Sequence, residues 1–141
     1  MRLLLVAALA LAACARPDAA PAPPATSDAA PASAAPAATV QSLAASDLAA
    51  RMADPNVVVI DVRTPAEFGA GHVKGALNYD VTGSDFARQI ATLDKGKTYV
   101  VYCRSGSRSA RAGEQMIAAG FPTVFNAGGF SALQAAGVPA E

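Results

Sequence analysis

Hydrophobic and polar positions follow two alternating patterns from residue 40 to residue 141. Short apolar runs, rich in β-branched residues, predict buried strands over residues 56–62, 97–103 and 123–126, with a short strand near residues 76–78. Segments with helical spacing lie between and after them, over residues 46–52, 64–68, 84–93, 107–120 and 130–137. This alternation predicts one α/β domain with a mainly parallel sheet.

Three of the expected helices begin with a hydroxyl side chain that can cap the first turn. Ser46 and Ser84 precede two of them, and Thr64 precedes the third. The third start is the most clearly marked, because Pro65 takes the first helical position and Glu67 the third, as in a capping box. We therefore expect the chain to enter a helix directly after Thr64.

The first 39 residues show neither pattern. Arg2 precedes an unbroken apolar run over residues 3–13, which is too short for a membrane span of about 20 residues but typical of a secretory signal. The run ends in Leu-Ala-Ala-Cys, which resembles a bacterial lipobox, where the cysteine is lipidated and becomes the new N-terminus. Residues 1–14 are predicted to be a signal peptide with lipidation at Cys14. Ordinary cleavage after small residues is the alternative.

Residues 15–39 consist almost entirely of Ala, Pro, Ser, Thr and Asp, without a large apolar side chain. Such a segment cannot bury enough surface to offset the entropy of ordering, and its prolines keep it extended. We expect a disordered tether that holds a domain of residues 40–141 away from a membrane. The expected location is the periplasmic side of the cell envelope, with the outer membrane favoured because Ala15 follows Cys14. Without lipidation, the protein is expected to be soluble in the periplasm.

Composition narrows the possible functions. The chain has 141 residues and a formal net charge of zero, so charge gives no support for nucleic-acid binding. One histidine, His72, lies far in sequence from the two cysteines, which is a poor ligand set for a metal. A Gly-x-Ser-x-Gly elbow is absent, and Gly96-Lys97-Thr98 lacks the glycine five positions earlier that a P-loop requires, since Ala91 stands there. We therefore expect no metal and no cofactor.

Cys103 ends an expected strand, at the edge of the sheet where parallel α/β folds form their sites. The loop that leads into the next helix contains Arg104, Ser105, Gly106, Ser107 and Arg108. Curled backbone amides, a helix N-terminus and two arginines all favour an anion there. The same environment favours thiolate over thiol, so the sequence predicts a nucleophilic Cys103 in an anion pocket.

Cys103 has two other interpretations. A free cysteine at a strand end can be an inert core residue, but the flanking glycine and arginines have no use in that role. An exported protein can also form a disulfide, here between Cys14 and Cys103. Lipidation of Cys14 would exclude that pairing, because a thioether sulfur cannot form a disulfide.

Three ordered segments resemble the rhodanese-type sulfurtransferases. Residues 103–108, CRSGSR, are similar to their active-site loop. Residues 59–78, VIDVRTPAEFGAGHVKGALN, are similar to their N-terminal signature, and residues 126–139, NAGGFSALQAAGVP, to their closing segment. The resemblance covers about residues 39–139. One departure is Phe130, where the family often has tryptophan.

The resemblance implies a five-stranded parallel sheet with helices on both faces. It also implies that Cys103 takes a sulfane sulfur from a donor such as thiosulfate, as a persulfide, and passes it to cyanide or a thiol. In this scheme the loop amides cradle the persulfide, and the side chains of Arg104 and Arg108 attract the anionic donor. The resemblance names no protein partner.

Alternatives within the resemblance also stay open. Phosphatases and arsenate reductases of this fold have the arginine six positions after the cysteine, whereas Arg108 follows Cys103 by five, which favours sulfur transfer. A non-catalytic sulfur carrier is the second alternative. Asp61 and Arg63 are mainly architectural in the family, with a possible supporting role in the site. Arg63 and Glu67 are spaced to form an ion pair, and His72 is expected to be a structural hydrogen-bonding residue.

Overall fold

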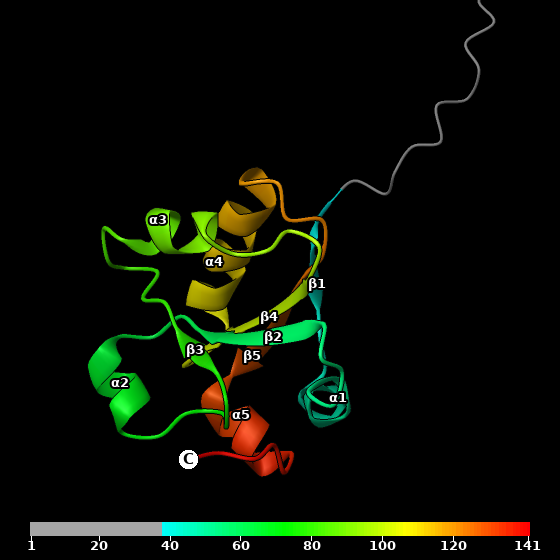
Figure 1. The fold of residues 1–141 in the computed structure, drawn as a ribbon. Coiled ribbons are helices and arrows are strands. Elements are labelled where there is room, and N and C mark those ends of the chain that lie inside the picture. Colours follow the sequence, from blue (N-terminus) through cyan, green and yellow to red (C-terminus); the bar gives the residue numbers. More distant parts are fainter. Residues whose placement is uncertain (1–37) are drawn as a thin grey trace, which may run out of the picture. The chain divides into compact units, whose positions relative to one another are not determined.

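The computed structural model describes residues 38–141. The predicted signal peptide, the lipidation site Cys14 and nearly all of the predicted tether lie outside this range. Within it, the chain forms a five-stranded sheet in the order β1-β5-β4-β2-β3, in which every neighbouring pair is parallel (Figure 1). The strands are β1 (Val40–Ser42), β2 (Val57–Asp61), β3 (Leu77–Asn78), β4 (Thr98–Cys103) and β5 (Val124–Gly129).

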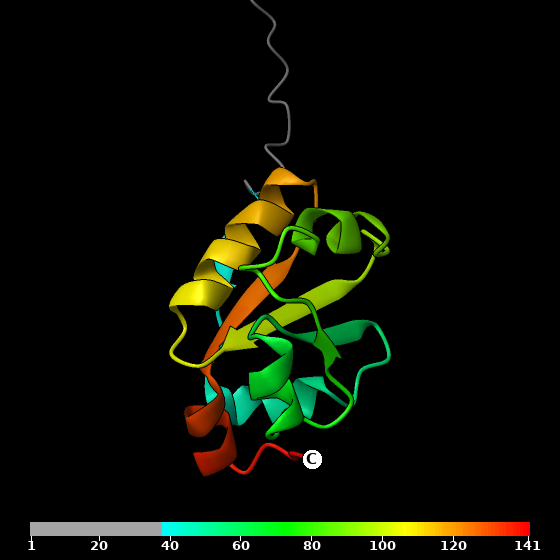
Figure 2. The same ribbon diagram turned by 90° about the vertical axis from the view of Figure 1, so that its left-hand side faces the viewer.

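Helices cover both faces of this sheet. They are α1 (Ala45–Arg51), α2 (Pro65–Gly69), α3 (Phe86–Ala91), α4 (Ser107–Ala118) and α5 (Phe130–Ala135). Helices α3 and α4 lie on one side of the sheet, and α1 and α5 lie on the other (Figures 1 and 2). The predicted α/β class, with a parallel five-stranded sheet between helical layers, is therefore confirmed.

The central strand β4 shows why the sequence has a continuous apolar run there. Tyr99, Val101 and Cys103 join the core cluster beneath α3 and α4. Val100 and Tyr102 point the other way, into the cluster beneath α1 and α5. Successive side chains of a strand alternate between faces, so a sheet covered on both sides needs apolar residues at every position. Cys103 therefore ends a strand that is buried from its second residue onward.

The predicted helix starts have different outcomes. At α2 the capping box is confirmed, because the Thr64 hydroxyl accepts from the Glu67 amide and the Glu67 carboxylate accepts from the Thr64 amide. Ser46 does not cap α1, because the helix begins one residue earlier and Ala44 takes the cap position. Ser84 does not cap α3, which begins later, after Asp85.

Strand β1 was not predicted as a separate element. It has only three residues, and it pairs with β5 at the sheet edge, from Val40 against Val124 to Ser42 against Asn126. This pairing continues in the bond from the Leu43 amide to the Asn126 carbonyl, which keeps the chain extended up to α1. Strand β5 is also longer than the predicted residues 123–126, since it extends to Gly129. None of the helices in residues 38–141 has the length and apolar character of a membrane span.

Candidate active site

Cys103 lies at the carboxyl end of β4, between β2 and β5. A short loop leads directly into α4, which begins at Ser107 (Figure 2). Gly106 is the N-cap of α4, and its φ of 99° lies in the left-handed region that glycine adopts without strain. This conformation directs the Gly106 amide to the Cys103 sulfur, with an N–Sγ distance of 3.1 Å.

The sulfur is surrounded by hydrogen-bond donors. Burial by itself raises the pKa of the Cys103 thiol, but the Ser109 hydroxyl and the amides of Ser109, Ser105 and Gly106 outweigh it, so the pKa is lowered overall. A hydrogen bond to the charged form favours that form. The loop therefore favours a thiolate at a position where Cys103 exposes no surface.

Two glycines at the end of β5 allow the loop to lie against the sheet. A Cβ atom on Gly129 would be 2.6 Å from the Arg104 carbonyl oxygen. A Cβ atom on Gly106 would be 3.5 Å from the Gly128 Cα. The close approach of the loop backbone thus explains the glycine at position 129, whereas Gly128 is explained by its φ of 82°, in the left-handed region.

Ser109 and Asn126 belong to the site but were missed by sequence reasoning. The buried Ser109 hydroxyl lies 3.5 Å from the Cys103 sulfur and 2.7 Å from the Asn126 Oδ1. Asn126 also donates through Nδ2 to the Gly106 carbonyl, at 3.1 Å. The signal for Asn126 in the sequence was a polar residue at the end of a predicted strand, two positions before the Gly-Gly pair.

The loop arginine Arg108 is held by α2. Its two terminal nitrogens donate to the two carboxylate oxygens of Glu67, at 2.7 and 2.8 Å. The expected ion pair between Arg63 and Glu67 is therefore wrong. The capping box turns the Glu67 carboxylate back toward Thr64, where Arg108 reaches it. Arg104, by contrast, is solvent-exposed, as is the more distant Arg111 on α4.

Arg63 instead pairs with Asp61, and both side chains are buried. The guanidinium donates to both Asp61 carboxylate oxygens, at 2.6 to 3.0 Å, and to the Gly71 carbonyl at 2.7 Å. It also lies over the Phe130 ring, 4.4 Å from the centroid, so the phenyl group at this position serves as a stacking partner. No hydrogen bond among residues 38–141 joins the Asp61–Arg63 pair to the cysteine loop. The contacts of the pair hold together the segments after β2 and α2.

His72 is also engaged in structural contacts. Its ring stacks on Phe68 with a centroid distance of 3.6 Å, and Nδ1 lies 3.1 Å from the Phe68 carbonyl oxygen. Its Nε2 lies 3.6 Å from the Glu141 carboxylate. These contacts tie the segment after α2 to the C-terminal residue and fit the expected structural role.

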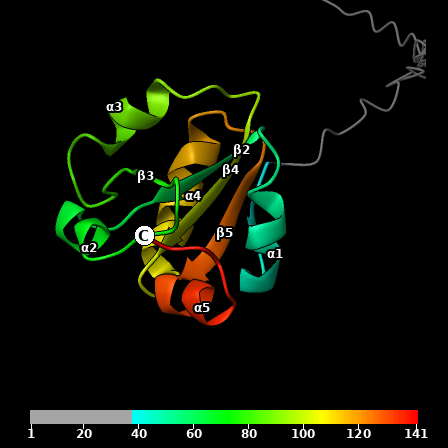
Figure 3. The ribbon, with the colours of Figure 1, turned by 60° about the horizontal axis from the view of Figure 1, so that its bottom comes forward.

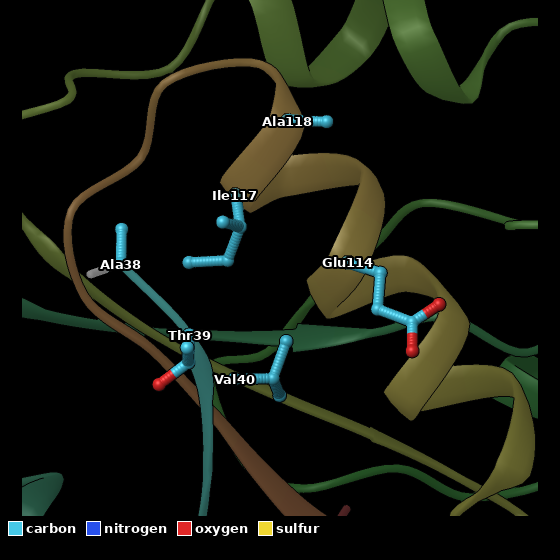
Figure 4. Close-up of a pocket in the computed structure, with 6 residues that line it drawn as sticks. All are labelled: Ala38, Thr39, Val40, Glu114, Ile117 and Ala118. Carbon is cyan, nitrogen blue, oxygen red and sulfur yellow. The ribbon is translucent and has the colours of Figure 1, made fainter.

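A groove of about 440 Å³ lies between β1 and α4 (Figure 4). It is lined by Ala38, Thr39, Val40, Glu114, Ile117 and Ala118. None of these residues belongs to the cysteine loop. Strand β1 is at the edge of the sheet, whereas the loop follows β4, which lies between β2 and β5 (Figure 3), so the groove and the loop are separate features.

Comparison with known proteins agrees with this geometry. The family model described as "Rhodanese-like domain" matches residues 44–136. A sulfurtransferase of Allochromatium vinosum is 33% identical over 97 residues, which covers 67% of this chain and 89% of that protein. The thiosulfate sulfurtransferase PspE of Escherichia coli is 40% identical over 72 residues, which covers 50% of this chain and 67% of that protein.

Solved structures show the same fold. A rhodanese-related protein of Thermoplasma volcanium superposes with a TM-score of 0.64 at 29% sequence identity. The match covers 72% of this chain and 97% of that chain. The similarity therefore includes nearly the whole of the solved domain.

Proposed function

Since the chain belongs to the rhodanese-like domain family, we propose that it transfers a sulfane sulfur from thiosulfate or a similar donor to cyanide or a thiol. Cys103 would carry the sulfur as a persulfide. The observation that carries this proposal is the Gly106 amide donating to the Cys103 sulfur at 3.1 Å, at the end of a buried strand. A thiolate stabilised in this way needs no separate general base.

The reaction has two balanced halves. In the first, the Cys103 thiolate attacks the outer sulfur of thiosulfate, an S–S bond forms to Sγ, and sulfite leaves with the electron pair of the broken S–S bond. In the second, cyanide attacks the outer sulfur, and the Sγ–sulfur bond breaks with its electron pair returning to Cys103. Thiocyanate leaves and the thiolate is restored.

The ion pair at the loop weakens the case for hydrolysis of a phosphate ester. Arginine commonly recognises a phosphate group by two parallel hydrogen bonds from its planar guanidinium. In Arg108 both terminal nitrogens already donate to Glu67 in this way. Arg104 is left as the exposed loop cation that can attract an anionic donor.

The test is the intact mass of the purified protein after incubation with thiosulfate, before and after addition of cyanide. We expect a gain of one sulfur atom that cyanide discharges and that is absent in Cys103→Ser. No gain with thiosulfate or other sulfane donors would reject the proposal, and phosphatase and arsenate reductase assays on the same sample would test the alternative. A persulfide without turnover on any acceptor would instead indicate a sulfur carrier.

The location is a separate proposal. We propose that the protein is exported and anchored in the cell envelope through lipid on Cys14, because the sequence before it ends in a lipobox-like Leu-Ala-Ala-Cys. Metabolic labelling with a fatty acid should mark the wild-type protein, and Cys14→Ala should lose the label and appear in the soluble fraction. Retention of the label in Cys14→Ala would contradict this.

A further inference from the structure

Ser109 has more acceptors within reach than it can serve. Its hydroxyl oxygen lies 2.9 Å from the Gly106 carbonyl, 2.7 Å from the Asn126 Oδ1 and 3.5 Å from the Cys103 sulfur. The side chain is fully buried, so solvent is not an alternative partner. A serine hydroxyl has one proton and therefore donates to one acceptor at a time.

Asn126 reduces this choice to two acceptors. Its Nδ2 donates to the Gly106 carbonyl at 3.1 Å, and the backbone amide four positions along α4 donates to the same oxygen at 3.0 Å, so both lone pairs of that oxygen have donors without Ser109. The Asn126 Oδ1 accepts from the Gly128 amide at 2.9 Å, which fixes the orientation of the side-chain amide and leaves one lone pair for Ser109. The Ser109 proton is consequently shared between the Asn126 Oδ1 and the Cys103 sulfur.

We infer that Ser109 switches its single proton between these two acceptors during sulfur transfer, and that Asn126 is the positioning residue for this switch. The inference rests on the proposed function. When Sγ is a thiolate, the hydroxyl turns to Sγ. When the charge has moved to the outer sulfur of a persulfide, the hydroxyl turns back to Asn126.

The switch acts mainly on the second half of the reaction. As the acceptor attacks the outer sulfur, the bonding electron pair returns to Sγ, and this developing charge is what the Ser109 hydroxyl stabilises. In the first half, the hydrogen bond from Ser109 stabilises the thiolate before it attacks. The bond therefore lowers the energy of the starting state and accelerates this half less. The nearby cations do not substitute for it, because Arg108 is paired with Glu67 and Arg104 is in solvent.

The first experiment separates the two half-reactions in Ser109→Ala, by following persulfide formation and its discharge with cyanide by rapid-quench mass measurement. We expect discharge to slow about tenfold, the effect of losing one hydrogen bond to a charged group, and loading to change by less than about threefold. The exposed Ser46→Ala on α1 is the matched control and should change neither rate. Equal slowing of both halves, or no slowing, would overturn the inference.

The second experiment measures the thiolate directly. The ultraviolet absorbance of the Cys103 thiolate is followed against pH, as the difference from the same protein with Cys103→Ser. Ser109→Ala should move the titration midpoint upward by about one pH unit, because the thiolate loses a donor. An unchanged midpoint would contradict the switch, and this readout is available even if no sulfur donor is ever accepted.

Asn126→Asp tests the positioning role. A carboxylate at this position accepts the Ser109 proton more strongly, so it should draw the hydroxyl from Sγ and slow discharge in the same direction as Ser109→Ala. The effect should largely vanish in the Ser109→Ala background, because no hydroxyl is left to draw away. An undiminished effect there would mean that the aspartate acts through its charge or through loss of the Nδ2 bond to the Gly106 carbonyl, and it would reject the role of Asn126 as the positioning residue for Ser109.

Failure of the inference and failure of the proposed function are distinguishable. If wild-type protein forms no persulfide, the proposed function fails while the thiolate titration still decides whether Ser109 donates to Sγ. If wild-type protein turns over and Ser109→Ala behaves like wild type in both experiments, the proposed function stands and the switch is rejected.

Discussion

Glu67 and Arg108 are 41 positions apart in the chain, yet each carboxylate oxygen of Glu67 accepts a hydrogen bond from a different terminal nitrogen of Arg108. The pair joins α2 to the first turn of α4. Glu67 completes the capping box of α2 at the same time. One side chain therefore links the start of a helix to the end of the cysteine loop.

Replacing Glu67 with glutamine should remove an acid-sensitive part of the stability. The bond from Arg108, acting against burial, lowers the pKa of Glu67 from 4.5 to about 2. A carboxyl group with a lowered pKa contributes stability that is present above about pH 4.5 and is lost as pH falls toward 2. Urea unfolding at neutral pH should show Glu67→Gln to be less stable by about 1 kcal/mol.

The difference between wild type and Glu67→Gln should shrink as pH falls through that window. Unfolding free energies measured at several pH values below 5 provide the check. Curves that stay parallel down to the lowest accessible pH would show that Glu67 contributes nothing through its charge.

Arg104 should affect donor binding more than turnover. It is an exposed cation immediately after Cys103, so Arg104→Ala should raise the KM for thiosulfate by about two- to fivefold with little change in kcat. The difference should decline at high salt, because exposed charges are screened. Arg111→Ala, which removes an exposed arginine further along α4, is the matched control. If both variants give the same KM, specific attraction by Arg104 is refuted.

Gly129→Ala should displace the cysteine loop. The added Cβ would be 2.6 Å from the Arg104 carbonyl oxygen and 3.3 Å from its carbon, and neither backbone atom can move without moving the loop. We expect a loss of about 1–3 kcal/mol in unfolding free energy and at least about tenfold lower activity. Gly69→Ala is the control, because a Cβ there has no atom within 4 Å and α2 gains a better helix former. Full activity in Gly129→Ala would disprove the tight fit.

Gly113→Ala should destabilise the contact between α4 and β1, and a second change should repair it. A Cβ at Gly113 would lie 2.8 and 2.9 Å from the two methyl groups of Val40. The clash should cost about 1–3 kcal/mol, which the higher helix propensity of alanine offsets only in part. Val40→Ala removes both methyl groups, so the double variant should be at least as stable as Val40→Ala alone. Thermal unfolding of wild type, the two single variants and the double variant measures the coupling between the two positions. If the two losses of stability simply add, the predicted contact is contradicted.

The parts of the fold that depend on local sequence were predictable. The capping box at Thr64 needs only neighbouring residues. The central strand β4 is buried and largely apolar from Tyr99 to Cys103 because both of its faces are covered. Cys103 and its loop were recognisable for the same reason, since a strand, a glycine and a helix start follow one another directly. These features carry their cause within about ten residues of sequence.

Other parts depend on tertiary contacts that spacing does not specify. Arg63 has carboxylates two positions before it and four positions after it, and only the folded chain shows that it pairs with Asp61. Strand β1 has two exposed residues among three, so it carries no apolar run and forms because β5 is available to pair. Ser109 and Asn126 meet across 17 positions, beyond any local pattern.

Cys103 has no accessible surface, although we propose it as the nucleophile of the site. A second sulfur bonded to it would extend the reactive atom away from that buried position, but only by the length of one bond. An acceptor atom that lies in a recess of another folded protein could not reach the outer sulfur, because the two protein surfaces would come into contact first. The protein should therefore exchange sulfur with small molecules, or with thiols at the tip of a narrow protruding chain, and discriminate among acceptors by their width as well as by their chemistry.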